Sequence, residues 1–302
     1  MIQKTGLPRF FVLFTKSFRM TEDITKRGKN RILDRASVIT SRQNPIVSET
    51  VKLGDKKHRE AQGLFLLDGV KLTLEALSSD LTLEYVLMTE GAARRFEGAL
   101  SAIPDDTRVY ILSDPAFSRV TDEKSPEGVV AAVRYSDAVR REYESADAGS
   151  GECRLLLDAV QNPENFGAVM RSARAFGMKD IITGAGCADV YGRRVMRASM
   201  GAALHAGTLR TNDLPLVCRE LVSRGHRVFA ATPSESARSI LDIDLRRGDC
   251  IVIGNEGHGV SREVMGSVTG SLYIPMEKGQ ESLNAASAAA VILWELYRSQ
   301  KK

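Results

Sequence analysis

The sequence has few of the residues that build metal centres and disulfide frameworks. It contains 4 cysteines and 4 histidines in 302 residues, and no two cysteines form a CxxC motif. These residues lie far apart along the chain, so their spacing predicts neither a zinc site nor a set of disulfides. Free thiols in a reducing cytoplasm are the simplest interpretation, and we expect no metal ion.

The N-terminal region lacks an apolar run of useful length for export. Its longest run, residues 10–14 (FFVLF), is too short for a signal-peptide core or a membrane span. We therefore expect a cytoplasmic protein with no membrane partner. Met20 opens a polar stretch that leads into the first recognisable domain, so a further hypothesis is that translation starts there. A mass of the intact native protein close to that of all 302 residues would refute this hypothesis.

Two common nucleotide-binding signatures are also absent. No GxGxxG follows the first strand predicted in the C-terminal half, and no GxxxxGKS occurs anywhere. These absences disfavour the usual dinucleotide-binding fold and a P-loop NTPase. Any nucleotide-like ligand would therefore have to be held in another way.

The basic residues are unevenly placed, although the formal net charge is only +4. Such a cluster suits a partner with a phosphate backbone. A solvated, flexible basic arm is an equally good interpretation. The residues concerned all precede residue 60 and are Lys26, Arg27, Lys29, Arg31, Arg35, Arg42, Lys52, Lys56, Lys57 and Arg59.

The length and pattern of the chain predict two α/β domains. We expect a basic, flexible extension over residues 1–35, a small domain over 36–135, a linker over 136–151 and a second domain over 152–302. The linker is charged and then rich in small polar residues. In the small domain the pattern predicts helices over 45–59, 70–79 and 91–100, and strands over 63–69, 83–89 and 108–113.

In the second domain, strands alternate with helices, which predicts a mostly parallel sheet covered on both faces. Apolar runs such as RLLL and IVIG are typical of strands buried on both sides. The predicted strands are 154–160, 180–183, 226–232, 249–255 and 271–276, and the predicted helices are 166–176, 192–201, 214–225, 261–268 and 283–298.

Three segments, residues 162–177, 251–261 and 272–290, each carry a polar loop at the end of a predicted strand of this domain. Open α/β sheets bind ligands at the carboxyl ends of their strands. The three segments therefore predict a site for a nucleotide-like cofactor.

The residue types in these segments allow two interpretations. Glycines such as Gly254 let the backbone approach a ligand closely, but a glycine-rich turn is often only a turn. Ser282 and Asn284 precede an alanine-rich helix, where they either cap the helix or contact a ligand.

The order and spacing of the three segments resemble the motifs of the SpoU/TrmH family of RNA 2′-O-ribose methyltransferases, in the SPOUT class. The resemblance implies a knotted α/β fold that holds S-adenosylmethionine largely through main-chain contacts. It implies that Gly254, Ile274 and Leu283 are the main cofactor contacts, and that Glu256, Met276 and Asn284 come next.

The same resemblance places Arg171 where the family carries its catalytic arginine. It implies catalytic roles for Arg171, Asn165, Ser282, Asn284 and Glu256. A guanidinium is poorly suited to accept a proton, so we expect Arg171 to grip a phosphate and to stabilise charge developing on the 2′-oxygen. The alternative for Arg171 is an ordinary ion pair on a helix surface.

A basic helix lies between the motifs. Arg193, Arg194 and Arg197 are expected beside the site, where they could meet RNA phosphates, and Arg197 with Ser199 resembles an RxS element of the family. A solvated basic face is the alternative.

Residues 39–77 resemble the substrate-binding domain that precedes the catalytic domain in SpoU-type enzymes of ribosomal RNA, although Asp68 stands where the family more often has Glu. This resemblance favours ribosomal RNA as the substrate. Transfer RNA is one alternative, and a non-catalytic RNA-binding or ribosome-assembly protein of the same fold is another. The family also implies a homodimer.

Overall fold

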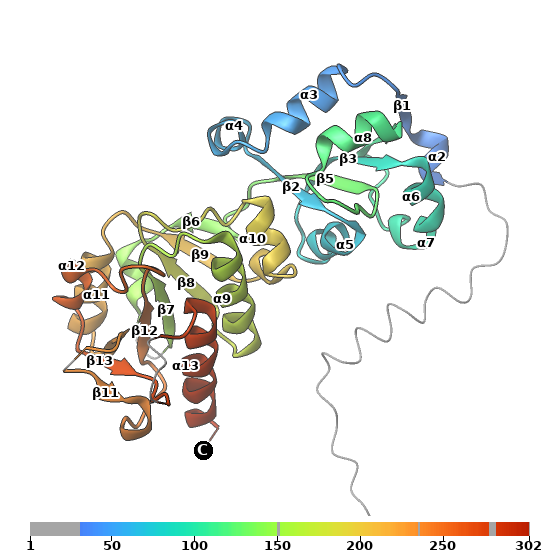
Figure 1. The fold of residues 1–302 in the computed structure, drawn as a ribbon. Helices are drawn as coiled ribbons and strands as arrows, with labels where there is room; N and C mark the ends of the chain where they lie inside the picture. Colours follow the sequence, from blue (N-terminus) through green and yellow to red (C-terminus); the bar gives the residue numbers. More distant parts are fainter. Residues whose placement is uncertain (1–30, 150–151, 235, 278–281, 302) are drawn as a thin grey trace, which may run out of the picture.

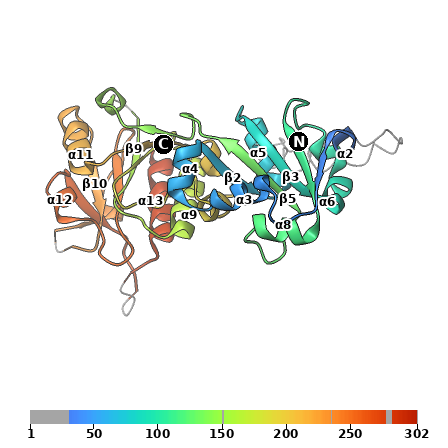
Figure 2. The ribbon, with the colours of Figure 1, turned by 90° about the horizontal axis from the view of Figure 1, so that it is seen from above.

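The chain folds around two β-sheets, one from residues 37–134 and one from residues 140–273 (Figures 1 and 2). The computed structural model describes residues 31–149, 152–234, 236–277 and 282–301. The apolar segment 10–14 and Met20 lie outside the described residues, as does most of the predicted basic extension.

The first sheet contains β1 (Ser37–Ile39), β2 (Leu64–Asp68), β3 (Leu83–Thr89), β4 (Arg108–Leu112) and β5 (Val129–Arg134). Its strand order is β1-β4-β3-β5-β2, and β5 is antiparallel to both of its neighbours. The helices of this part are α2 (Arg31–Arg35), α3 (Pro45–Lys52), α4 (Lys56–Gln62), α5 (Val70–Ser78), α6 (Glu90–Arg95), α7 (Glu97–Leu100) and α8 (Asp114–Val120).

The single helix predicted over residues 45–59 is wrong, because the chain forms α3 and α4 there. The break falls between Lys52 and Lys56. The Asp55 carboxylate accepts a hydrogen bond from the His58 amide at 3.0 Å and so caps the start of α4. Asp and Gly favour caps and turns over helix interiors, which explains why the helix restarts there.

The second sheet contains β6 (Arg140–Glu142), β7 (Arg154–Leu157), β8 (Asp180–Thr183), β9 (Gly207–Arg210), β10 (Val228–Ala231), β11 (Arg238–Ser239), β12 (Cys250–Ile253) and β13 (Gly270–Tyr273). Its order is β11-β13-β10-β12-β7-β8-β9-β6, and every pairing is parallel. The residues of β7 and β12 are all buried. The large parallel sheet predicted for this half of the chain is confirmed.

Helices lie against this sheet on both faces (Figure 1). They are α9 (Pro163–Ala175), α10 (Arg193–Ala198), α11 (Leu214–Ser223), α12 (Arg262–Met265) and α13 (Ala285–Ser299), with short 3-10 turns η1 (Ser145–Ala148), η2 (Ala202–Leu204) and η3 (Ile240–Asp242). The helix predicted over 261–268 is shorter than expected, and the strand predicted over 271–276 ends at Tyr273.

The segment expected to be a linker contributes a strand to the second sheet. β6 lies within residues 136–151 and pairs with β9 in parallel. Tyr143 continues this contact, because its amide donates to the carbonyl of Arg210 at 2.8 Å. Much of this segment is therefore fixed to the second sheet. The domain boundaries themselves stay a prediction.

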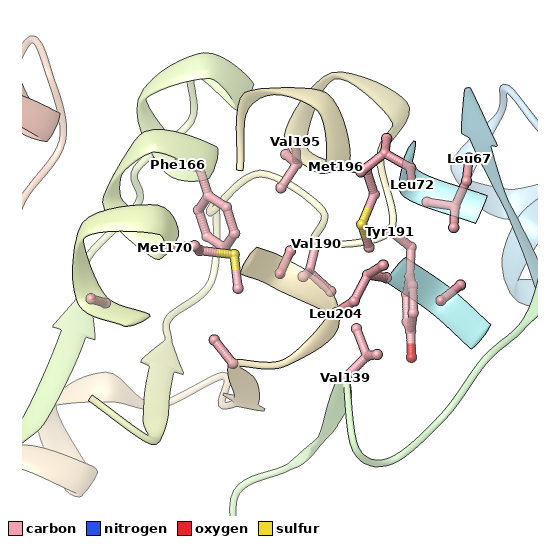
Figure 3. Close-up of a cluster of buried hydrophobic side chains, with 14 of the residues drawn as sticks. Leu67, Leu72, Val139, Phe166, Met170, Val190, Tyr191, Val195, Met196 and Leu204 are labelled. Carbon is pink, nitrogen blue, oxygen red and sulfur yellow. The ribbon is translucent and has the colours of Figure 1, made fainter. Parts of the chain in front are cut away.

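One buried cluster joins the two halves of the molecule (Figure 3). Leu67 and Leu72 come from the first part, and Val139 and Tyr191 meet them from the second. The Tyr191 ring stacks on Tyr135 with centroids 3.9 Å apart and planes within 9°. This part of the contact between the halves is therefore apolar and buried.

The described residues contain no helix long and apolar enough to cross a membrane. They also contain no group of three or more histidine, cysteine, aspartate or glutamate side chains placed to hold a metal ion.

Candidate active site

Three polar loops meet at the carboxyl edge of the second sheet, after β7, β12 and β13. They surround a cavity of about 510 Å³, within the size range of small-molecule sites. The sheet is parallel throughout, so the carboxyl ends of its strands share this edge. Of the predicted site residues, those that line the cavity are Asn165, Gly254, Glu256, Ile274, Met276, Ser282, Leu283 and Asn284.

The loop after β12 closes tightly on itself. Asn255 and Gly259 exchange two backbone hydrogen bonds, each 2.9 Å long. The Asn255 side-chain oxygen accepts from the amides of Gly257 and His258 at 2.9 and 3.1 Å. Gly254 lies so close to the returning chain that a Cβ there would be 2.3 Å from Gly259. This position therefore admits only glycine without a change in the loop.

A polar network joins the three motif segments. The Asn165 side-chain nitrogen donates to the Glu256 carboxylate at 3.0 Å, and the Asn284 side-chain nitrogen donates to the Asn165 oxygen at 2.7 Å. The same carboxylate accepts from the backbone amides of Gln161 and Asn162 at 3.3 and 3.2 Å. Glu256 thus ties the start of α9 to the loop after β12.

The hydrogen bonds around Glu256 determine its charge state. Burial raises the pKa of this carboxyl, but the hydrogen bonds from Asn165 and from nearby backbone amides outweigh burial, and the net effect is a lowered pKa. Glu256 is therefore a stable carboxylate near neutral pH. It is better suited to hold donors in place than to accept a proton.

Two asparagines cap the helices that open onto the cavity. The Asn162 side chain accepts from the amides of Glu164 and Asn165 at the start of α9. The Asn284 oxygen accepts from the amides of Ala286 and Ser287 at the start of α13, while its nitrogen contacts Asn165. Asn284 is therefore a helix cap, and the same side chain also faces the cavity as part of the polar network. Capping the helix does not prevent it from contacting a ligand.

Arg171 does not reach this network. It lies on α9, six residues after Asn165, which places it about 9 Å further along the helix. Its side chain is exposed. Among the described residues it has no hydrogen-bond or ion-pair partner, so the surface ion pair considered as an alternative is not seen there. Its guanidinium is available to an incoming ligand.

Two of the three predicted RNA-binding arginines pair with acidic side chains of the first part of the chain. Arg193 lies 3.4 Å from the Asp68 carboxylate. Arg197 lies 2.6 Å from Asp122 and 2.9 Å from Glu123. In this arrangement their charges hold the two halves together. Arg194 is exposed and has no ion-pair partner among the described residues, so its role in RNA binding stays a prediction.

Asp68 is the buried member of this contact. Its side chain is only 6% exposed, and neither carboxylate oxygen has a hydrogen-bond partner among the described residues. Burial raises the pKa of Asp68, and the neighbouring Arg193 opposes that rise. The ion pair therefore compensates a charge that would otherwise be costly to bury.

The sequence interpretation missed one wall of the cavity. Ala231, Thr232 and Pro233, at the end of β10, line it together with the motif residues. β10 lies between β12 and β13 in the sheet, so its carboxyl end must face the same space. The turn-forming residues after the predicted strand 226–232 were the only signal for this wall.

Two protein-family models match the chain. The model of the SpoU rRNA Methylase family matches residues 152–294. The model of the MRM3-like substrate binding domain matches residues 44–131. The cavity and its network lie within the first match, and the first sheet lies largely within the second.

Individual proteins resemble the chain over most of its length. A 23S rRNA (guanosine(2553)-2′-O)-methyltransferase, RlmP, of Bacillus subtilis (strain 168) is 30% identical over 85% of this chain and 98% of the relative. An AdoMet-bound rRNA methyltransferase from Sinorhizobium meliloti is 25% identical, with a TM-score of 0.75 over 87% of this chain and 98% of that one. An RNA 2′-O ribose methyltransferase structure has the same TM-score and coverage at 27% identity.

Proposed function

The chain belongs to the SpoU rRNA methylase family, and we propose that it is an S-adenosylmethionine-dependent 2′-O-ribose methyltransferase of ribosomal RNA. The observation that carries this proposal is the network of Asn165, Glu256 and Asn284 at one wall of the cavity. It unites the three segments that bear the family motifs. The similarity to the Bacillus relative, which spans nearly all of that protein, supports ribosomal RNA as the substrate.

The cavity fits S-adenosylmethionine in size and in chemistry. Its volume of about 510 Å³ accommodates a nucleoside-sized ligand. Ile274, Met276 and Leu283 supply apolar surface for a base, and Met276 and Leu283 are 38% and 41% exposed. The close turn at Gly254 presents backbone rather than side chain to the ligand. We propose these residues, with Glu256 and Asn284, as the cofactor contacts.

In this proposal one group of residues orients the target nucleotide and another stabilises the charge that develops in the reaction. When bound, S-adenosylmethionine supplies an electrophilic methyl group. Glu256 keeps Asn165 and Asn284 fixed, and with Ser282 these side chains orient the target nucleotide, so that alignment supplies much of the rate. Arg171, exposed and without a described partner, grips a phosphate of the substrate and stabilises charge on the 2′-oxygen.

Transfer of radiolabelled methyl groups from S-adenosylmethionine to total ribosomal RNA and total transfer RNA tests the function. Wild type should label ribosomal RNA, and Arg171→Ala should abolish the label while leaving cofactor binding intact, because Arg171 does not line the cavity. Arg171→Lys should also lose most activity, since lysine lacks the two-pronged geometry of a guanidinium. Label in transfer RNA alone would refute the assigned substrate. Normal turnover by Arg171→Lys would show that the two-pronged guanidinium is not needed.

We also propose that the protein is a cytoplasmic homodimer. α13 presents Trp294 and Val291, which are 50% and 42% exposed. Trp294 packs on Phe176 and Tyr297, with ring centroids 5.8 and 6.1 Å away, so the exposed ring is held in a fixed position. Ordered apolar surface of this kind is typical of subunit interfaces. Light scattering should give twice the chain mass of 33.0 kDa, and Trp294→Glu should give the monomer; a monomeric wild type would contradict the proposal.

A further inference from the structure

A second, smaller cavity lies beside the cofactor cavity at the same edge of the sheet. Its volume is about 140 Å³. Phe166 lines it, whereas the preceding residue, Asn165, lines the cofactor cavity. The loop after β8 forms another wall, and a Cβ at Gly186 in that loop would lie 3.3 Å from the Cβ of Ala159, just before the start of α9. The first turn of α9 therefore borders both cavities.

Three basic side chains from different parts of the fold line this second cavity. Lys56 comes from α4 in the first part of the chain, Arg140 from β6 and Arg210 from β9. The acidic side chain in the lining is Asp189. No single surface helix or loop accounts for this gathering of charge, because it requires the two halves of the molecule to be packed together.

The charges around Asp189 do not balance. Its carboxylate pairs with Arg59 at 2.6 Å and with Arg140 at 3.1 Å. The side chains of Arg59, Asp189 and Arg140 are 6%, 9% and 15% exposed, so this group is shielded from water. One carboxylate facing two guanidinium groups leaves one excess positive charge where solvent screens poorly. Binding an anion would neutralise it.

Lys56 and Arg210 are held only loosely by their own partners. The Lys56 ammonium lies 3.9 Å from Glu60, and the Arg210 guanidinium lies 4.0 Å from Glu142. These pairs are long and solvent-exposed, and such pairs contribute little. Both cations can therefore turn toward a ligand in the cavity at small cost.

The size of the cavity selects a small anion. Its volume corresponds to about five water molecules at roughly 30 Å³ each. It is well below the roughly 300 Å³ at which small-molecule sites begin. A phosphate group fits these limits, and a whole nucleotide does not.

We propose that this cavity binds one phosphodiester group of the RNA substrate, close to the nucleotide that is methylated. The inference rests on the proposed function for its location beside the reacting ribose. Lys56 and Arg210 contact the phosphate from opposite halves of the molecule, and the Arg59, Asp189 and Arg140 group supplies the fixed positive charge behind it. The RNA backbone thereby becomes a bridge between the two halves.

The test measures the binding of poly(U) by fluorescence anisotropy over a series of salt concentrations. Each phosphate contact with single-stranded nucleic acid contributes about 0.7 to the slope of log affinity against log salt. Lys56→Gln with Arg210→Gln should lower the slope by about 0.7 and no more, because both charges act on one phosphate. Lys179→Gln with Arg224→Gln removes the same two charges from exposed side chains at the amino edge of the sheet and is the matched control.

A second arm uses inorganic phosphate, compared with chloride at equal ionic strength, as a stabiliser in thermal melts. If the double variant gives the same poly(U) slope as wild type, the assignment to RNA is wrong. If, in addition, inorganic phosphate stabilises wild type but not the double variant, the cavity binds the free anion. A slope loss of about 1.4 would mean two separate phosphates and would also overturn it. Because poly(U) binding requires no methyl transfer, an inactive wild type with the predicted slope change would refute the proposed function and leave this site standing.

Discussion

Gly254→Ala should displace the loop after β12, because there is no space for a side chain at this position. A Cβ there would lie 2.3 Å from the carbonyl carbon of Gly259 and 2.3 Å from the amide nitrogen of Val260. Both are backbone atoms, held by the paired hydrogen bonds between Asn255 and Gly259. The clash can be relieved only if the loop opens, and this loop is a wall of the cofactor cavity.

The expected magnitude follows from the cost of overpacking, which is about 1–3 kcal/mol. At roughly 2–4 °C per kcal/mol, the melting temperature should fall by about 2–12 °C. Because cofactor binding requires the closed loop, the same free energy should weaken the binding of S-adenosylmethionine by about 5- to 150-fold. Differential scanning calorimetry and isothermal titration calorimetry measure the two effects separately.

Gly266→Ala is the matched control. A Cβ at Gly266, just after α12, would lie 3.6 Å from the nearest atom, the carbonyl oxygen of Arg262, which is an ordinary contact. This variant should melt and bind the cofactor like wild type. Wild-type affinity and melting temperature in Gly254→Ala would refute the argument that the close turn shapes the cavity.

Two further substitutions test contacts that hold the site and the two halves together. The pKa of Glu256 is lower in the folded protein than the value of 4.5 in the unfolded chain, so its carboxylate stabilises the fold above pH 4.5. This stabilisation is lost as the pH falls through the pKa of the folded state. Glu256→Gln should therefore melt at a lower temperature than wild type at pH 7, and the two melting temperatures should converge in acid. Arg193→Met should cost on the order of 3 kcal/mol in urea denaturation, because it leaves Asp68 buried without its nearest cation, and adding Asp68→Asn should restore most of the loss. Arg194→Met, on the exposed side of the same helix, should change stability by less than about 0.5 kcal/mol; equal losses in the two arginine variants would contradict the ion pair.

The parts of the fold that the sequence predicted are those with strong local patterns. The buried strands β7 and β12 are continuous apolar runs, and polar loops follow each of them. A parallel sheet brings such loops to one edge, so the pattern of strands and loops was enough to predict that the three segments carrying Asn165, Glu256 and Asn284 form one site. The resemblance to a family supplied the cofactor and the roles, which the pattern alone did not.

The parts that could not be predicted depend on long-range partners. β6 is three residues long with the sequence RRE, and only its pairing with β9 makes it a strand. Arg193 and Arg197 follow a pattern typical of an RNA-binding surface, yet their partners Asp68 and Asp122 lie 125 and 75 residues earlier. Intrinsic propensity cannot reveal such contacts, because tertiary packing decides them.

The polar network also has a consequence for the order in which the protein folds. Its two side-chain contacts join residues 91 and 119 positions apart, and Asn284 opens the last helix described. Contacts of such long sequence separation form late, because the chain must lose conformational entropy in closing a long loop before the contacts can stabilise it. A nascent chain that still lacks α13 can complete its first sheet, but it has no Asn284 to complete the network. Catalytic competence should therefore arise in a single late step, after synthesis has passed α13, and no shorter folding intermediate should carry partial activity.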